Sequence, residues 1–180
     1  LEAYAIDITR ESGAILSRYF GGPLDIQYKD SNHKDPVTTA DKAAQEFLSQ
    51  AITDRFPDHS ILGEEDPEQD NSPAQDFVWV VDPLDGTKNF VAGLPIYSCS
   101  VGIMYRGVPV VGAVFIPWPC DNNGVVVHAR KGAGAFVDQR PISVLQAHEF
   151  RGNALTAVPG SLITERSLYE GIQSKIGEFR

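Results

Sequence analysis

The stretch that decides the fold is residues 77–90, Phe-Val-Trp-Val-Val-Asp-Pro-Leu-Asp-Gly-Thr-Lys-Asn-Phe. It begins with five consecutive apolar residues of β-branched and aromatic types, which predict a strand buried on both faces. The run stops at two carboxylates three positions apart, Asp82 and Asp85, so we expect both acids to lie at a strand end. Pro83 cannot donate to a ladder and Gly86 tolerates a positive φ, which predicts a sharp turn after the strand.

This turn can direct three oxygen ligands toward one point. They are the carboxylates of Asp82 and Asp85 and the main-chain carbonyl of Leu84, which are hard donors of the kind that Mg²⁺ prefers. We expect Thr87 to be the N-cap of a short helix, whose free N–H groups and positive dipole end attract an anion. An Asp-Pro-x-Asp-Gly string is also ordinary turn chemistry, so a turn without a ligand is the competing interpretation.

The composition predicts a soluble, acidic globular protein. Its 180 residues fit one large domain or one and a half ordinary ones, with 42% hydrophobic and 22% charged residues. The formal net charge of −9 argues against a nucleic-acid surface, which needs clustered Lys and Arg. No apolar run approaches the roughly 18 residues of a membrane span. The first residues lack the features of a signal peptide, and Cys99 and Cys120 are expected as free thiols in a reducing cytoplasm.

Two amphipathic helices are predicted before residue 57. Apolar residues recur at a spacing near 3.6 over residues 1–20, which end at Gly-Gly-Pro, and again over residues 38–56. Thr38 and Asp41 match the Ser/Thr-x-x-Asp/Glu capping pattern, so Asp41 is a helix cap, a carboxylate near the metal site, or both. Between the helices we expect a short strand at 24–29 and a polar loop at 30–36.

An acidic segment follows another short strand, predicted at residues 60–62. Its usual interpretation is a solvated loop. The alternative is that Glu64 joins Asp82 and Asp85, because ligands of open α/β sheets bind where the carboxyl ends of neighbouring strands meet. The sequence alone does not show that these two strands are neighbours.

The rest of the chain is rich in short strands. Apolar runs at 96–105, 108–116, 125–129 and 135–137 predict an antiparallel meander, with a hairpin at 131–134 and a turn at 138–141. Further strands are expected at 142–144 and 154–158, and a helix begins at 159–161. This layout predicts a layered α/β or α+β domain. The histidines are too scattered for a metal site and are expected in loops or on the surface: His33, His59, His128 and His148.

Three motifs resemble those of the inositol monophosphatase family of Mg²⁺-dependent, lithium-sensitive phosphatases. The first is residues 82–87, Asp-Pro-Leu-Asp-Gly-Thr, with Asn89 and Phe90 after it. Upstream, residues 35–41 are similar to the family's D-x-V-T-x-x-D, and residues 63–65 to its G-E-E. Their order and spacing are similar too. The resemblance implies a layered αβαβα sandwich that is usually a homodimer.

The resemblance also implies a metal site for two or three Mg²⁺ ions. Glu64, Asp82 and the Leu84 carbonyl would hold the first ion, and Asp82 with Asp85 would reach the second. Asp41 would support a third, weaker ion or its hydration shell.

Further implied roles concern the substrate. The amides of Gly86 and Thr87 would hold the phosphate, and Glu64 with Thr87 would orient and help to deprotonate the metal-bound water. Tyr97 and Ser161 are candidates for lining the substrate pocket.

One departure from the family concerns the C-terminal part. Family members are longer and carry a Trp-Asp motif there, whose Asp is a ligand of the second metal. The tryptophans of this chain are Trp79, followed by Val80, and Trp118, followed by Pro119. We therefore expect residues 1–180 to be the N-terminal metal- and phosphate-binding portion of such a domain, without its C-terminal subdomain.

The expected function is Mg²⁺-dependent hydrolysis of a small phosphorylated polyol or sugar, first of all inositol monophosphate, by direct attack of a metal-activated water. No nucleic-acid or membrane partner is expected. Residues 85–87, Asp-Gly-Thr, also resemble part of the haloacid-dehalogenase motif Asp-x-Asp-Gly-Thr, although two residues separate the acids here. The other alternative is a non-catalytic module that binds a divalent metal or phosphate.

Overall fold

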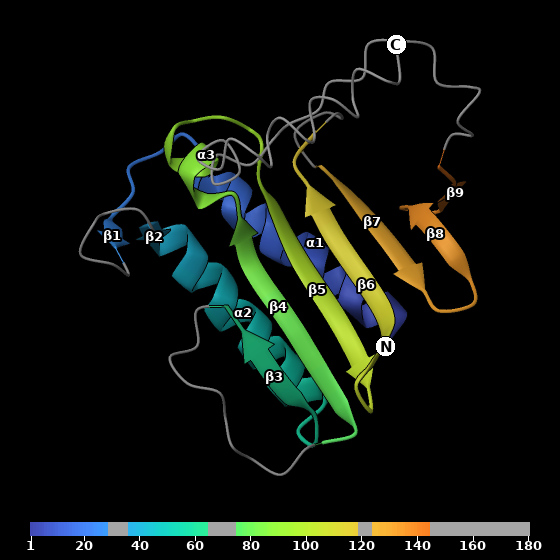
Figure 1. The fold of residues 1–180 in the computed structure, drawn as a ribbon. Helices are drawn as coiled ribbons and strands as arrows, with labels where there is room; N and C mark the ends of the chain where they lie inside the picture. The colour runs from blue at the N-terminus through green and yellow to red at the C-terminus, as the bar shows by residue number, and fades with distance from the viewer. Residues whose placement is uncertain (29–35, 65–74, 119–123, 145–180) are drawn as a thin grey trace, which may run out of the picture. The chain divides into compact units, whose positions relative to one another are not determined.

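The computed structural model describes residues 1–28, 36–64, 75–118 and 124–144. The helices and strands of these residues fall within one compact unit, Leu1–Ile142. In this unit two long helices lie against a seven-stranded sheet, as Figure 1 shows. The predicted α/β class is therefore confirmed. The strand and helix predicted beyond residue 150 lie outside the described residues.

Both long helices occur where the apolar spacing predicts them. Helix α1 is Glu2–Tyr19 and α2 is Thr39–Arg55. Thr38 is the N-cap of α2 and forms a capping box with Asp41, which confirms the capping prediction. No helix of the described residues is long and apolar enough to cross a lipid bilayer.

The sheet runs in the order β3-β4-β5-β6-β7-β8-β9. Strands β3 and β4 are parallel, and each later neighbour is antiparallel, which confirms the predicted meander. The parallel pair matters most for the site, because its two strands end at the same edge of the sheet. The bounds are β3 Ser60–Gly63, β4 Phe77–Asp85, β5 Ser98–Tyr105, β6 Val108–Ile116, β7 Val125–Arg130, β8 Gly134–Val137 and β9 Arg140–Ile142.

Two predictions about β4 are confirmed and one is wrong. The strand ends at Asp85, so both acids lie at its end, and Gly86, with φ of 88°, makes the turn after it. The pairing of β4 with β5 also shifts register between Asp82 and Asp85, an irregularity that re-aims side chains within a strand. The prediction of burial on both faces is wrong, because Trp79 and Val81 are buried while Val78 and Val80 on the other face are only partly buried.

Two short strands differ from their predictions as well. Strand β2, Pro36–Thr38, pairs with β1, Ile26–Tyr28, whereas the sequence predicts a loop that includes residue 36. Strand β9 covers 140–142 instead of 142–144, because the turn before it is confined to Asp138 and Gln139. Strands of three residues carry too little alternation to be placed from sequence.

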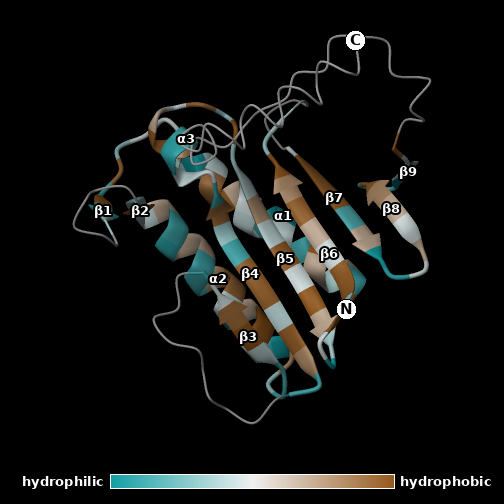
Figure 2. Ribbon diagram, viewed as in Figure 1, coloured by the Kyte–Doolittle hydropathy of each residue, from teal (hydrophilic) through white to brown (hydrophobic). Residues whose placement is uncertain are grey.

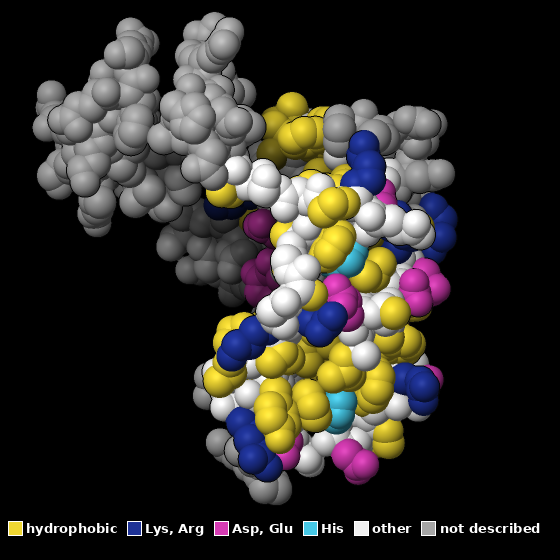
Figure 3. Space-filling view, turned by 90° about the vertical axis from the view of Figure 1, so that its right-hand side faces the viewer, with side chains coloured by type: hydrophobic (Ala, Val, Ile, Leu, Met, Phe, Trp, Pro, Cys, Tyr) yellow, Lys and Arg dark blue, Asp and Glu magenta, His cyan; other side chains and the backbone are white. Residues whose placement is uncertain are grey.

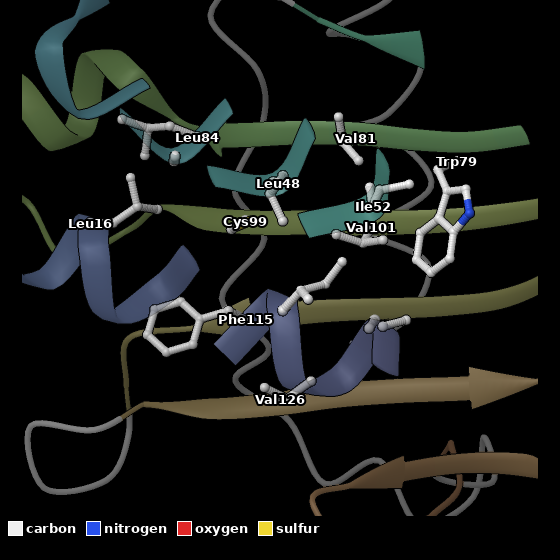
Figure 4. Close-up of a cluster of buried hydrophobic side chains, with 14 of the residues drawn as sticks. Leu16, Leu48, Ile52, Trp79, Val81, Leu84, Cys99, Val101, Phe115 and Val126 are labelled. Carbon is white, nitrogen blue, oxygen red and sulfur yellow. The ribbon is translucent and has the colours of Figure 1, made fainter. Parts of the chain in front are cut away.

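The core lies between the helices and the sheet. Figure 4 shows Leu16 of α1 and Leu48 and Ile52 of α2 directed at buried residues of the sheet, and Figure 2 shows the hydrophobic residues of β4, β5 and β6. A Cβ on Gly13 would lie 2.2 Å from the Phe115 ring, so α1 approaches β6 very closely there. This packing fixes the sheet whose strand ends carry the acids.

Polar side chains also attach α1 to the β7–β8 hairpin. Arg10 pairs with Asp138, and Arg130 pairs with Glu2. His128 contacts the Glu2 carboxylate at 3.0 Å and the Asp138 carbonyl at 2.7 Å, with only 10% of its side chain exposed. The expectation of a loop or surface position is therefore wrong for His128. Figure 3 shows basic and acidic groups close together on this side of the molecule.

Candidate metal and phosphate site

The ends of β3 and β4 bring two acidic side chains together. Glu64 directly follows β3, and its N–H donates to the Val81 carbonyl of β4 at 3.1 Å. This bond continues the parallel pairing and places Glu64 beside Asp82. The two carboxyl groups are hydrogen-bonded to each other. The strands are thus neighbours, which the sequence left open.

The Glu64–Asp82 pair concentrates negative charge. The pKa of Asp82 is raised from 3.8 to about 7, first of all by burial and then by the Glu64 carboxylate, through its charge and its hydrogen bond. The Asp85 charge also contributes to this rise, while the Leu84 N–H, which donates to Asp82 Oδ1 at 3.1 Å, opposes it. Two carboxyl groups share a hydrogen bond only when one carries a proton. A proton, or a cation in its place, therefore compensates the pair.

Asp85 stands apart from this pair. It is exposed at the end of β4, and its Oδ2 is 3.5 Å from the Ser98 hydroxyl of β5. Among the described parts of the chain, no three His, Cys, Asp or Glu side chains lie close enough together to hold a metal ion. The structure thus joins Glu64 to Asp82 directly, and Asp85 acts on Asp82 through its charge.

A buried network links α2 to the same strand end. The Asp41 carboxylate is only 1% exposed, and its Oδ2 accepts hydrogen bonds from the Thr38 N–H and hydroxyl at 2.7 and 2.5 Å. Its Oδ1 lies 3.1 Å from the Thr87 hydroxyl, which is also 3.0 Å from the Leu84 carbonyl oxygen. Asp41 therefore caps its helix and also contacts the segment that carries Leu84 and Asp85.

The prediction that Thr87 is an N-cap is wrong. Helix α3 is Thr87–Val91, and its N-cap is Gly86 in the left-handed region, with φ of 88°. Glycine adopts this conformation without the strain that a Cβ causes. Because Gly86 makes the turn, the Thr87 side chain bonds Leu84 and Asp41 instead of capping the helix.

Three further residues lie near the site, and the sequence analysis predicts no role for two of them. Ser98 is the first, although a polar residue in an apolar strand beside acidic residues indicates a functional role. Asn89 is the second, and its Nδ2 donates to the Ile96 carbonyl at 2.9 Å. Tyr97 is buried against Phe20 and Phe90, so it belongs to the core and not to an open pocket wall. Ser161 lies outside the described residues.

The comparison with known families decides the classification. The model of the inositol monophosphatase family matches residues 1–174. The chain belongs to this family. Members of the inositol monophosphatase family are phosphatases, that is, phosphoric monoester hydrolases. Membership excludes the haloacid-dehalogenase alternative.

Individual relatives agree with the classification. The chain is 36% identical to the fructose-1,6-bisphosphatase/inositol-1-monophosphatase of Aquifex aeolicus over 73% of its own length and 48% of the relative's. It is 31% identical to the histidinol-phosphatase of Chlorobaculum parvum, over 78% and 51%. The solved IMPase of Thermotoga maritima is similar in fold, with a TM-score of 0.70 and 32% identity over 80% and 53%. The chain thus spans about half the length of the curated relatives it matches.

Proposed function

We propose that this chain is the metal- and phosphate-binding portion of a Mg²⁺-dependent phosphomonoesterase. The observation that carries the proposal is the Glu64–Asp82 pair, with Asp85 close enough to raise the pKa of Asp82 further. Neighbouring carboxylates repel one another, as the raised pKa of Asp82 indicates, and a divalent cation relieves such repulsion. A cluster of carboxylates at the ends of neighbouring strands is typical of a cation site.

The donor set suits Mg²⁺. Carboxylate and carbonyl oxygens are its preferred protein ligands. Glu64, Asp82 and the Leu84 carbonyl would hold one ion, and Asp82 with Asp85 would hold another; Asp41 would support a third through its hydration shell. Bound Mg²⁺ would make water more acidic and polarise the phosphoryl group.

The Thr87 hydroxyl is well placed to accept a proton from the attacking water. It has one hydrogen to donate and lies within bonding distance of two acceptors, the Asp41 carboxylate and the Leu84 carbonyl. It can pass its proton to Asp41 Oδ1 while accepting one from an attacking water, with Glu64 orienting that water. The amides of Gly86 and Thr87 would hold the phosphate. The water oxygen would bond to phosphorus as the P–O bond to the substrate alcohol breaks, and the alcohol oxygen would take up a proton from bulk water, so that no phospho-enzyme forms.

The proposed substrate is a small phosphorylated polyol or sugar. Inositol monophosphate is the first choice, because the family and the relative from Aquifex aeolicus are named for it. Fructose 1,6-bisphosphate and histidinol phosphate are the other substrates that the relatives' names suggest. A cytoplasmic, lithium-sensitive homodimer is part of the same proposal.

The test is phosphate release from inositol 1-phosphate, fructose 1,6-bisphosphate and histidinol phosphate by the purified protein, with Mg²⁺ or with EDTA. We expect release that requires Mg²⁺ and falls when lithium is added. Mg²⁺ binding without phosphate release from any of the three would favour the non-catalytic module. Trapping of a covalent aspartyl-phosphate would refute direct attack by water.

A further inference from the structure

We infer that Asn89 is a positioning residue for the proposed site, because its side chain holds the main chain after α3 against Gly86. The inference rests on the proposed function, in which Gly86 and Thr87 hold the phosphate. Asn89 Nδ2 donates to the Ile96 carbonyl at 2.9 Å, and the Asn89 main-chain carbonyl accepts from the Leu94 N–H at 2.8 Å. One residue thereby ties both ends of segment 94–96 to α3.

Burial does little to hold this segment. Residues 91–96 are all exposed, and the first buried residue after them is Tyr97. Main-chain bonds from Ala92 and Gly93 back to α3 fix the beginning of the segment. At its far end, Asn89 supplies the one side-chain hydrogen bond to 91–96 found among the described residues. The position of the Ile96 carbonyl therefore depends on the Asn89 amide.

The Ile96 carbonyl packs directly on Gly86. A Cβ at Gly86 would lie 2.8 Å from this oxygen and 3.3 Å from Tyr97 Cα, so no side chain fits between them. Gly86 has a positive φ, and the Ile96 carbonyl closes one side of its turn. Without the Asn89 amide, this carbonyl is free to move away and the N–H groups at 86 and 87 can change direction. The contact between Glu64 and Asp82 does not involve Asn89.

The test separates phosphate binding from metal binding. Wild type, Asn89→Ala and the control Gln50→Ala are titrated calorimetrically with Mg²⁺ alone, then with inorganic phosphate at saturating Mg²⁺. Gln50 is a matched control, because its side-chain amide bonds Asp54 on the exposed face of α2. We expect Mg²⁺ affinity to stay within about twofold in all three proteins, and phosphate to bind about threefold to tenfold more weakly to Asn89→Ala alone, as for one lost hydrogen bond.

A second variant and three outcomes decide the inference. Asn89→Asp should weaken phosphate binding further, because it turns a carboxylate toward the Ile96 carbonyl. Phosphate binding that is equal in wild type and Asn89→Ala overturns the positioning role and leaves the proposed function intact. Joint loss of Mg²⁺ and phosphate binding in Asn89→Ala, with lost far-UV circular dichroism, also overturns it. A wild-type protein that binds neither probe refutes the proposed function, and this inference with it.

Discussion

Replacing Asp82 with Asn should stabilise the metal-free protein at pH 8 and greatly reduce its stabilisation by Mg²⁺. The folded state raises the pKa of Asp82 from 3.8 to about 7, so the folded protein binds a proton more tightly than the unfolded chain does. The stabilisation of the folded state by this tighter proton binding is complete below about pH 4, and it is lost as the pH rises through 7. Above pH 7, an ionised Asp82 remains beside Glu64 and Asp85, and the Asn variant lacks this repulsion.

The size of the effect follows from the pKa. Moving a pKa from 3.8 to about 7 corresponds to roughly 4 kcal/mol. Asp82 is only partly buried, so water screens the interaction and we expect about 1–2 kcal/mol. For a protein of this length, that corresponds to a rise in Tm of about 2–8 °C. Mg²⁺ at ten times its Kd should stabilise the wild type by about 1.4 kcal/mol, and Asp82→Asn by much less.

Thermal unfolding at pH 5 and pH 8, in EDTA and in Mg²⁺, measures both effects. Asp54→Asn is the control, because Asp54 is an exposed carboxylate on α2. We expect Asp54→Asn to follow the wild type under all four conditions. An equal pH dependence of stability in Asp82→Asn and the wild type, or equal stabilisation of both proteins by Mg²⁺, would refute the role of Asp82. In the phosphate-release assay, Asp82→Asn should lose activity although it folds.

Two further predictions concern groups that are not proposed as metal or phosphate ligands. Burial raises the pKa of the Cys99 thiol to about 12. In a Cys120→Ser background, a thiol reagent should therefore label Cys99 only as fast as the protein opens. Rapid labelling of Cys99 in the folded protein would contradict this prediction. Burial lowers the pKa of His59 below 6.5, and its Nδ1 accepts a hydrogen bond from Trp79 Nε1 at 2.9 Å, which an imidazolium cannot do. The stability that this bond contributes is present above pH 6.5 and is lost as the pH falls. Trp79 fluorescence, measured in a Trp118→Phe background, should therefore change on acidification. A constant signal down to pH 4.5 would contradict a neutral, hydrogen-bonded His59.

Local patterns were sufficient to predict the helices. The apolar spacing of α1 and α2, and the Thr38–Asp41 cap, depend on residues within a few positions of one another. The meander was predictable for the same reason, because its strands alternate and short turns separate them. The interactions that favour these helices and hairpins are between residues close in sequence, so the sequence pattern shows them directly.

The site required contacts that local patterns do not contain. That Glu64 meets Asp82 depends on the pairing of β3 with β4, and that Thr87 contacts Asp41 depends on how α2 packs. The bulge that carries β4 through Asp85 arises from its pairing with β5. Turn residues alone therefore predict the turn at Gly86, whereas the bulge before it becomes visible only in the pairing with β5.

The most direct test of the central claim is to locate a bound metal ion. Crystals of the protein soaked in Mn²⁺, as a substitute for Mg²⁺, would show the ion by its anomalous scattering. We expect a peak about 2 Å from carboxylate oxygens of Glu64 and Asp82 and from the Leu84 carbonyl oxygen. A fully occupied ion elsewhere, with Glu64 and Asp82 still hydrogen-bonded to each other, would contradict the proposed metal site.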